Sequence, residues 1–372
     1  MTPSVKETRS MRIVVKAESS RIERYPILLK SGLLRHFLKL LRGQSSWSKV
    51  FVITDGNVSP LFGRHLLSDL VIGGVDAWLI DFPAGEASKN ANVVNALHTQ
   101  LLEHGVRRDS LIIALGGGVV GDVAGYVAAT LLRGIKYIQV PTTLLAQVDS
   151  SVGGKVGIDH PLGKNLIGAF HQPAAVYVDP LVLQTLPERE YKSGLAEVVK
   201  IAAALDSSFF RFIEKHVTQI NKRETKTLAS IIERSVRLKA AVVQKDEFET
   251  GLRKVLNLGH TIGHAVEAAS NYRLRHGEAV AIGLVAESRI ARDMGLLTTR
   301  DFARLLQLMH RLGLRMEFPK LKDKQRFLSA LSADKKSVGA EAKFVLLEGI
   351  GRTIVGVDVP SPFIEAILKS GK

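Results

Sequence analysis

Short apolar runs recur through the first half of the chain, and amphipathic segments follow them. KVFVITD at 49–55 is mostly apolar and ends at an acid, which is typical of a buried parallel strand. NVVNALHTQLLEHG at 92–105 has apolar residues at helical spacing. The pattern predicts an α/β domain. We expect a helix near 32–42 and strands near 11–17, 24–30, 49–55, 76–82, 111–115, 137–140 and 174–179.

The alternation of strands and helices stops after LPERE at 186–190, where long helical patterns begin. We expect helices in YKSGLAEVVKIAAALD (191–206) and SIIERSVRLKAAVVQKDEFETG (230–251), and a loop with a small β-hairpin at 334–359. The predicted domains are therefore an α/β domain at 1–186, which includes a polar tail at 1–10, and a mostly α-helical domain at 187–372.

Length and composition support this division and exclude some kinds of site. A chain of 372 residues is too long for one average core, and 46% hydrophobic with 23% charged residues is ordinary for a globular protein. Cysteine is absent, which excludes disulfides and thiolate ligands, so any metal must use His, Asp and Glu. The N-terminus lacks an apolar core of signal-peptide length, and no apolar run is long enough to span a bilayer. We expect a cytoplasmic protein without a membrane partner.

The net charge of +15 does not by itself indicate a nucleic-acid-binding protein. Basic residues are spread along the chain, and clusters such as RDFARLLQLMHRLGLR have the spacing of solvated helix faces without interleaved aromatics. A basic balance also suits small anionic ligands. We do not expect nucleic acid as a partner.

A glycine motif lies between the predicted strand LIIAL and the helix that follows it. Gly116, Gly118 and Gly121 fit G-x-G-x-x-G, which lets a backbone approach the pyrophosphate of a dinucleotide at a helix N-terminus. No acid follows at the distance that the ordinary fingerprint requires to hold the ribose, although Asp55 at the end of another strand offers a carboxylate. The alternative is a tight glycine turn that serves only helix–sheet packing.

Polar residues then gather after Thr142-Thr143, which end the strand YIQV. Asp149, Lys155, Lys164 and Asn165 lie in a glycine-rich segment that we expect to form a loop rather than an ordinary helix. Lysines and amide donors in such a loop suit a phosphate. An ordinary charged surface loop is the alternative.

Three of the eleven histidines lie within 253–278. His260 and His264 are four residues apart in a predicted helix and share one face, and His276 opens the next helix. Imidazole is the commonest transition-metal ligand, whereas a single histidine is more often a core or surface residue. HTIGH lacks the glutamate that the zinc-protease motif H-E-x-x-H requires.

Glu197 offers a further ligand. It lies three residues before Lys200 in an apolar helical run, where a plain buried ion pair is the alternative. Glu197, His260 and His276 together would make a site with an open position. A metal that polarises an alcohol, beside a nicotinamide that accepts a hydride, suits a hydroxylated sugar-like substrate.

Several stretches together resemble 3-dehydroquinate synthases over roughly residues 50–350. They are GGGVVGDVAGYVAATLLRGI, VPTTLLAQVDSSVGGKVGIDHPLGKNLIGAFHQP, LAEVVK, LNLGHTIGHAVEA and LRHGEAVAIGL. The resemblance implies a Rossmann-like NAD-binding α/β domain, a mostly α-helical C-terminal domain, one divalent metal (Zn, possibly Co) and a homodimer. It places the enzyme in the shikimate pathway of aromatic amino acid biosynthesis.

The implied reaction converts 3-deoxy-D-arabino-heptulosonate 7-phosphate to 3-dehydroquinate and phosphate. NAD oxidises the C5 hydroxyl, the resulting ketone acidifies the neighbouring C–H, and phosphate leaves by β-elimination. The hydride then returns, the ring opens, and an intramolecular aldol step closes the carbocycle. NAD is thus regenerated in each turnover.

The resemblance also implies roles for individual residues. Glu197, His260 and His276 would bind the metal, and His264 would be a catalytic or phosphate-side group. The groups that hold the substrate's phosphate and carboxylate would be Lys155, Asn165, Lys200, Lys239, Arg253, Asn257 and Lys336. Asp149 and Glu249 would be acid/base and orienting carboxylates, and Arg133 would serve the neighbouring subunit. The NAD contacts would be Asp55, Asn57, Gly85, Glu86, Lys89, Gly117, Gly118, Val119, Val120, Gly121, Asp122, Thr142, Thr143, Lys155, Lys164 and Thr185.

Two enzyme classes with the same fold compete with this interpretation. Other sugar phosphate cyclases, such as 2-deoxy-scyllo-inosose and 2-epi-5-epi-valiolone synthases, use the same chemistry on other sugars. Metal-dependent alcohol and glycerol dehydrogenases share the fold but release NADH, and their sites would lack this set of phosphate-binding lysines and arginines.

Overall fold

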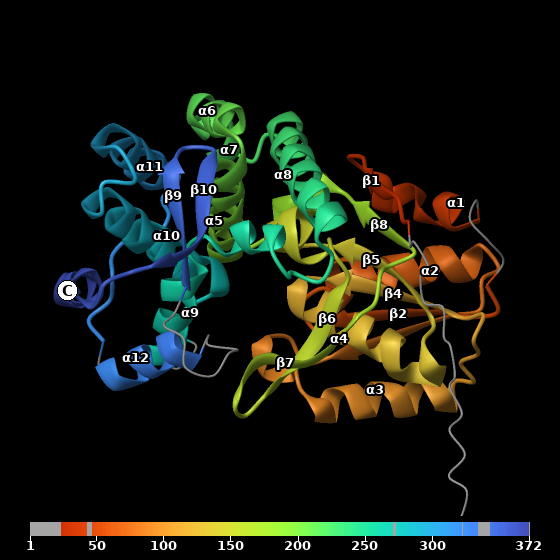
Figure 1. Cartoon of the computed structure of the whole chain (residues 1–372). Coiled ribbons are helices and arrows are strands. Elements are labelled where there is room, and N and C mark those ends of the chain that lie inside the picture. Colours follow the sequence, from red (N-terminus) through yellow and green to blue (C-terminus); the bar gives the residue numbers. More distant parts are fainter. Residues whose placement is uncertain (1–23, 43–46, 271–272, 322, 334–342, 372) are drawn as a thin grey trace, which may run out of the picture.

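A computed structural model describes residues 24–42, 47–270, 273–321, 323–333 and 343–371. Figure 1 shows a sheet-bearing N-terminal half beside a mostly helical C-terminal half. The expected polar tail at 1–10, the expected strand at 11–17 and Lys336 lie outside the described residues. Within the described part, no helix is both long and apolar enough to cross a membrane.

Six parallel strands form the central sheet, in the order β1-β8-β5-β4-β2-β3. They are β1 (Ile27–Leu29), β2 (Val50–Asp55), β3 (Ala77–Phe82), β4 (Leu111–Gly116), β5 (Lys136–Pro141) and β8 (Ala175–Val178). The predicted strands in the described part of the chain are therefore confirmed. The helices of this half are α1 (Phe37–Arg42), α2 (Arg64–Ile72), α3 (Ala91–Glu103) and α4 (Gly118–Thr130).

Alternate residues of each strand face opposite sides of the sheet, and both sides are buried. Phe51 and Ile53 of β2 belong to a core with Val123 of α4, whereas Val50 and Val52 belong to another core with residues of α1 and α2. Burial on both faces explains why these strands are continuous apolar runs rather than alternating ones.

The strand order reverses between β2 and β4. From β2 the chain passes outward to β3, and then crosses back to β4, β5 and β8 on the other side of β2. Asp55 ends β2 and Gly116 ends β4, so both lie at the carboxyl edge of this reversal. In open α/β sheets such a switch point is where ligands bind.

The segment expected to be a glycine-rich loop is instead a π-turn at Ala146–Ser150 and an antiparallel hairpin, β6 (Lys155–His160) with β7 (Gly163–Phe170). Gly157 and Gly168 face each other across it, and a Cβ on either would lie 2.4–2.5 Å from a backbone oxygen of the opposite strand. Glycine therefore permits close strand pairing here, which sequence composition made resemble a loop. Figure 1 shows the hairpin extending from the sheet towards the helical half.

The second half is built on the long helix α5, almost all of whose later residues are buried. Its helices are α5 (Glu188–Leu205), α6 (Ser207–Lys215), α7 (Val217–Asn221), α8 (Thr225–Lys245), α9 (His260–Ala269), α10 (His276–Asp293), α11 (Thr299–Arg311), α12 (Lys324–Ala333) and α13 (Ser361–Lys369). The predicted terminal hairpin is β9 (Lys343–Gly349) with β10 (Arg352–Asp358). The histidine helix begins only at His260, because Leu252–Asn257 form a 3-10 turn and Gly259 is left-handed at φ +79°.

Candidate active site

Glu197, His260 and His276 meet where α5 passes the first residues of α9 and α10. Glu197 Oε1 lies 3.4 Å from His276 Nε2 and 3.9 Å from His260 Nε2. One ligand atom from each of the three lies within 4.8 Å of the others. Neighbouring ligand atoms of a tetrahedral zinc ion are about 3.3 Å apart, since each bond is about 2.0–2.1 Å long. Small adjustments would therefore close this group around a divalent metal.

A backbone contact and burial favour the neutral tautomer of His260 that can bind a metal through Nε2. Its Nδ1 lies 3.2 Å from the carbonyl oxygen of Leu258, which only accepts, so Nδ1 carries the proton and Nε2 has the free lone pair. Burial, with the nearby Lys200 ammonium, holds the pKa of His260 well below its usual value. His260 is therefore neutral, which is the form that binds metals.

The carboxylate of Glu197 is charged and poorly satisfied. It is fully buried, and neither oxygen accepts a well-aligned hydrogen bond from the described residues, although Lys200 Nζ lies 2.5 Å from Oε2. Burial alone would raise its pKa, but the Lys200 ammonium and His276 hold the pKa of Glu197 well below the usual value. Burial lowers the pKa of His276, whereas Glu197 and Glu267 outweigh it and raise that pKa to about 9. A cation beside Glu197 is thus favoured, and a divalent metal fits.

Basic side chains surround this group, and acidic partners hold them. Lys239 Nζ on α8 lies 2.7 Å from Asp149 Oδ1 and donates to the Asp149 carbonyl at 2.6 Å. Burial, together with the like charges of Lys200 and Arg253, lowers the pKa of Lys239 despite Asp149. A bound anion would offset both the burial of the Lys239 charge and its repulsion by Lys200 and Arg253. The site is therefore suited to an anionic substrate.

The loop after α8 brings further polar groups to the same place. Glu249 pairs with Lys155 of the hairpin and accepts a hydrogen bond from Asn257 Nδ2 at 2.7 Å. Arg253 is buried and donates to the carbonyl of Gly153 at 3.4 Å. Lys155, Arg253 and Asn257 therefore converge across the join between the hairpin and the helical half.

Strained backbone conformations coincide with several of the predicted site residues. Five described non-glycine residues have positive φ, and Arg133 (66°), Asn165 (55°) and Glu249 (60°) are among them. Such conformations cost about 1–3 kcal/mol each and cluster at functional sites. The other two, Leu132 and Arg223, are not predicted site residues, and none of these conformations was accessible from the sequence.

The N-terminus of α4 lies at the carboxyl edge of the sheet. Gly117 caps α4 without any side-chain hydrogen bond, which leaves the first backbone N–H groups of the helix available. A Cβ on Gly117 would lie 3.0 Å from Thr143 Cγ2, and one on Gly121 would lie 2.7 Å from Gln139 Oε1. The motif therefore serves both close packing and open access, and the pyrophosphate of a dinucleotide fits it.

Charged residues expected around the cofactor form a connected set beside this turn. Lys89 pairs with Asp122 at 2.7 Å and donates to Asn165 Oδ1. Lys164 lies 3.0 Å from Glu86. Asp55 Oδ1 accepts from the backbone of Asn57 at 2.9 Å, which fixes the carboxylate at the end of β2.

The structure places the other predicted cofactor residues along the same edge, but not all site residues converge. Gly85 has φ +107° before Glu86, Val119 and Val120 lie in the first turn of α4, and Thr142 is buried after β5. Thr185 is exposed after β8 and donates to Val182 within its own turn. Arg133 is exposed beyond the C-terminal end of α4, whereas the glycine turn lies at the N-terminal end of this helix. It therefore does not join Glu197, His260 and His276 of its own chain.

His264 takes a separate position from the three ligand candidates. Its ring centroid lies 5.1 Å from that of His260 and 6.0 Å from that of His276, and its side chain is exposed. It belongs to a second possible group with Glu267 and His276. Glu267 is not among the predicted site residues, although its position seven residues after His260 places it on the same helix face.

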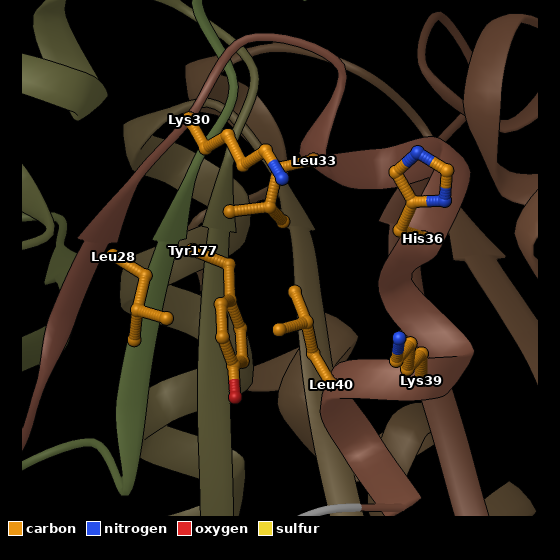
Figure 2. Close-up of a pocket in the computed structure, with 7 residues that line it drawn as sticks. All are labelled: Leu28, Lys30, Leu33, His36, Lys39, Leu40 and Tyr177. Atoms are coloured by element: carbon orange, nitrogen blue, oxygen red, sulfur yellow. The ribbon is translucent and has the colours of Figure 1, made fainter.

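A hollow of about 570 Å³ lies elsewhere, between β1, β8 and the first helices. Figure 2 shows its lining, which consists of Leu28, Lys30, Leu33, His36, Lys39, Leu40 and Tyr177. None of these residues belongs to the predicted site. The chemistry-bearing groups instead gather at the carboxyl edge of the sheet and its join with α5, α8, α9 and α10.

Comparison with known proteins decides the family. Sequence models of the 3-dehydroquinate synthase N-terminal and C-terminal regions match residues 79–193 and 194–337. A 3-dehydroquinate synthase of Desulforamulus reducens is 44% identical over 345 residues, which cover 92% of this chain and 96% of that protein. The chain belongs to the 3-dehydroquinate synthase family. The family resemblance and the expected fold class are thereby confirmed.

Solved structures of related cyclases share the fold. A 2-epi-5-epi-valiolone synthase from Streptomyces hygroscopicus with NAD+ and Zn2+ bound has 28% identity and a TM-score of 0.88, over 95% of this chain and 98% of that one. A 2-deoxy-scyllo-inosose synthase complexed with carbaglucose-6-phosphate, NAD+ and Co2+ has 27% identity and a TM-score of 0.84, over 93% and 96%. The Desulforamulus reducens 3-dehydroquinate synthase is thus more similar in sequence to this chain than these two cyclases are.

Proposed function

We propose that this chain is an NAD- and metal-dependent lyase that converts 3-deoxy-D-arabino-heptulosonate 7-phosphate to 3-dehydroquinate and phosphate. The observation that carries the proposal is the convergence of Glu197, His260 and His276 beside a cluster of basic side chains, in a member of this family. The cyclases that share the fold are less favoured, because their identity is 27–28% against 44% for a 3-dehydroquinate synthase.

Each part of the site has a task in this reaction. Glu197, His260 and His276 would hold a divalent metal, which would supply a Lewis acid for the C5 oxygen, and a bound NAD would supply a reversible hydride acceptor. The open turn at Gly117–Gly118 and the set Glu86, Lys89, Asp122 and Lys164 would hold the cofactor. Lys164 contacts Glu86 at 3.0 Å, so the cofactor side and the hairpin are joined.

The substrate carries a phosphate and a carboxylate, which need cations and donors. We assign this task to Lys155, Asn165, Lys200, Lys239, Arg253 and Asn257. In the absence of substrate, Glu249, Glu197 and Asp149 partner three of these lysines. Substrate binding therefore exchanges one anionic partner for another, and releases Asp149 and Glu249 to hold or orient a proton.

Phosphate release separates the candidate functions. The protein, supplied with the heptulosonate phosphate, zinc and NAD at a small fraction of the substrate concentration, should release phosphate far in excess of the NAD added. No NADH should accumulate, because the hydride returns in each turnover. Net NADH would instead indicate a dehydrogenase, and the absence of phosphate release would contradict the proposal.

We also propose a cytoplasmic homodimer in which Arg133 serves the site of the neighbouring subunit, and a domain boundary near residue 187. Arg133 is exposed with strained backbone. Leu162, Leu166 and Phe170 of the hairpin are 45–85% exposed, and a second copy would cover these apolar side chains. The boundary is supported by the start of α5 at Glu188, after the last strand of the sheet.

Subunit mixing tests the shared site. Arg133→Ala and Lys239→Met are each expected to lose at least about nine-tenths of the parent activity, but a mixed dimer contains one site with both groups intact. Random exchange of subunits should therefore restore about a quarter of the parent activity. If mixing restores nothing while sedimentation shows exchanged dimers, Arg133 does not act in the neighbouring subunit.

A further inference from the structure

Glu267 is a buried carboxylate that faces the candidate metal site from α9. It is 2% exposed and lies seven residues after His260, so both side chains project from the same face of the helix. Its two oxygens point to different partners. Oε1 lies 2.7 Å from Lys164 Nζ, and Oε2 lies 3.8 Å from His276 Nδ1.

The two nitrogens of His276 face two different carboxylates. Nε2 faces Glu197 at 3.4 Å, on the side of the ligand group, and Nδ1 faces Glu267. A ring that offers Nε2 to a metal carries its proton on Nδ1, and a carboxylate beside Nδ1 favours that tautomer and fixes the ring plane. For His260, the carbonyl of Leu258 performs the same task.

Lys164 gives Glu267 a fixed position and links it to the other half of the site. This lysine lies on β7 and also pairs with Glu86 at 3.0 Å, in the turn after β3. A continuous path of charged groups therefore runs from Glu86 through Lys164 and Glu267 to His276 and Glu197. It joins the carboxyl edge of the sheet to the ligand group.

We propose that Glu267 is a positioning residue of the metal centre, which holds His276 with Nε2 towards the metal and is itself held by Lys164. This inference rests on the proposed metal-dependent function. A second metal among His264, Glu267 and His276 is disfavoured, because it would require Nδ1 of a histidine already engaged through Nε2. The Lys164 ammonium, 2.7 Å from Glu267 Oε1, would also repel a second metal ion.

Metal affinity and cobalt spectroscopy test the proposal directly. Apo-protein of the parent and of Glu267→Gln is titrated with zinc against a chromophoric chelator, and the visible spectrum of the cobalt-loaded protein reports the ligand geometry. We expect zinc affinity to fall about 10–100-fold in Glu267→Gln, with an altered cobalt spectrum. Glu267→Gln should change the melting temperature of the apo-protein much less than zinc raises the melting temperature of the parent.

Controls distinguish positioning from general damage. Glu214→Gln removes a carboxylate paired with Arg304 at 2.9 Å on another part of the helical half, and zinc affinity should stay at the parent value. Lys164→Gln should weaken zinc binding less than Glu267→Gln, and the double variant should add little to Glu267→Gln. If Glu267→Gln does not fold, Glu267→Asp, which retains the charge but withdraws it from the ring, should show the same loss of affinity.

Several outcomes would overturn the inference. Zinc affinity of Glu267→Gln within twofold of the parent, with an unchanged cobalt spectrum, would show that Glu267 does not position His276. Two zinc ions per parent chain and one in Glu267→Gln would show that Glu267 is itself a ligand. A parent protein that binds no zinc or cobalt would instead contradict the proposed function.

Discussion

The Glu287 carboxylate on α10 caps the first turn of α9 by accepting a hydrogen bond from the backbone N–H of Gly259 at 2.5 Å. It also accepts from the N–H of Ile262 at 2.9 Å, and it is fully buried. Gly259, with φ +79°, has no side chain that could supply this cap. A residue on a neighbouring helix therefore fixes the point where α9 begins, and with it His260.

Removing the charge of Glu287 should loosen this end of the helix. In Glu287→Gln the amide group can accept only on its oxygen, so one buried backbone donor loses its partner. We expect the free energy of unfolding to fall by about 1–3 kcal/mol and zinc affinity to fall with it. Urea unfolding and chelator competition measure the two effects. Glu365→Gln on exposed α13 is the control, and equal stability of both variants would contradict the capping role.

Lys239 should matter for substrate binding rather than for folding. Lys239→Met preserves much of the side-chain volume but removes the ammonium that pairs with Asp149 at 2.7 Å and that we assign to the substrate. We expect kcat/KM for the heptulosonate phosphate to fall at least about tenfold, the value of one charge-assisted hydrogen bond. Steady-state phosphate release measures it. Lys245→Met, at the exposed end of the same helix, should match the parent.

The loop after α8 should become sensitive to acid through Asp246. Its carboxylate accepts from the N–H groups of Thr250, Gly251 and Arg253, which holds the pKa of Asp246 at about 2. The folded-state pKa lies below the unfolded value of about 3.9, so the stabilisation is full above that value and is lost as the pH falls towards 2.

A comparison with Asp246→Asn isolates this effect. The parent should melt at a higher temperature than Asp246→Asn at pH 6, and the difference should shrink as the pH is lowered to 3. Because the loop carries Glu249 and Arg253, the variant should also show a higher KM at neutral pH. A difference in melting temperature that does not vary with pH would exclude Asp246 as the titrating group.

The sheet and the ligand candidates were accessible from the sequence because their signals are local. The strand 49–55 is apolar on both faces, since both faces are buried. His260 and His276 begin neighbouring helices, and the spacing of His264 places it on the same helix face as His260. Burial of Glu197 with Lys200 was likewise foreseeable from an apolar run that contains both.

Features that depend on distant pairing were not accessible. The β6–β7 hairpin is rich in glycine because Gly157 and Gly168 meet across the strands, and only the register reveals this. The cap that Glu287 supplies to α9 depends on how closely α9 packs against α10. A Cβ on Gly283 would lie 2.0 Å from the Gly259 carbonyl oxygen, so that closeness itself requires glycine.

Removal of the metal should reveal how far the ligand group contributes to stability. Glu197 is fully buried beside Lys200, and its Oε1 faces two histidine nitrogens within 3.9 Å. A metal that binds only the folded state stabilises it by about 2.7 kcal/mol at one hundred times its dissociation constant. Dialysis against a chelator should therefore lower the melting temperature, and zinc should restore it in a concentration-dependent way. The same addition should leave His276→Ala unchanged, because the ligand group is then incomplete. An equal zinc-induced rise in His276→Ala would place the bound metal elsewhere and remove His276 from the ligand set.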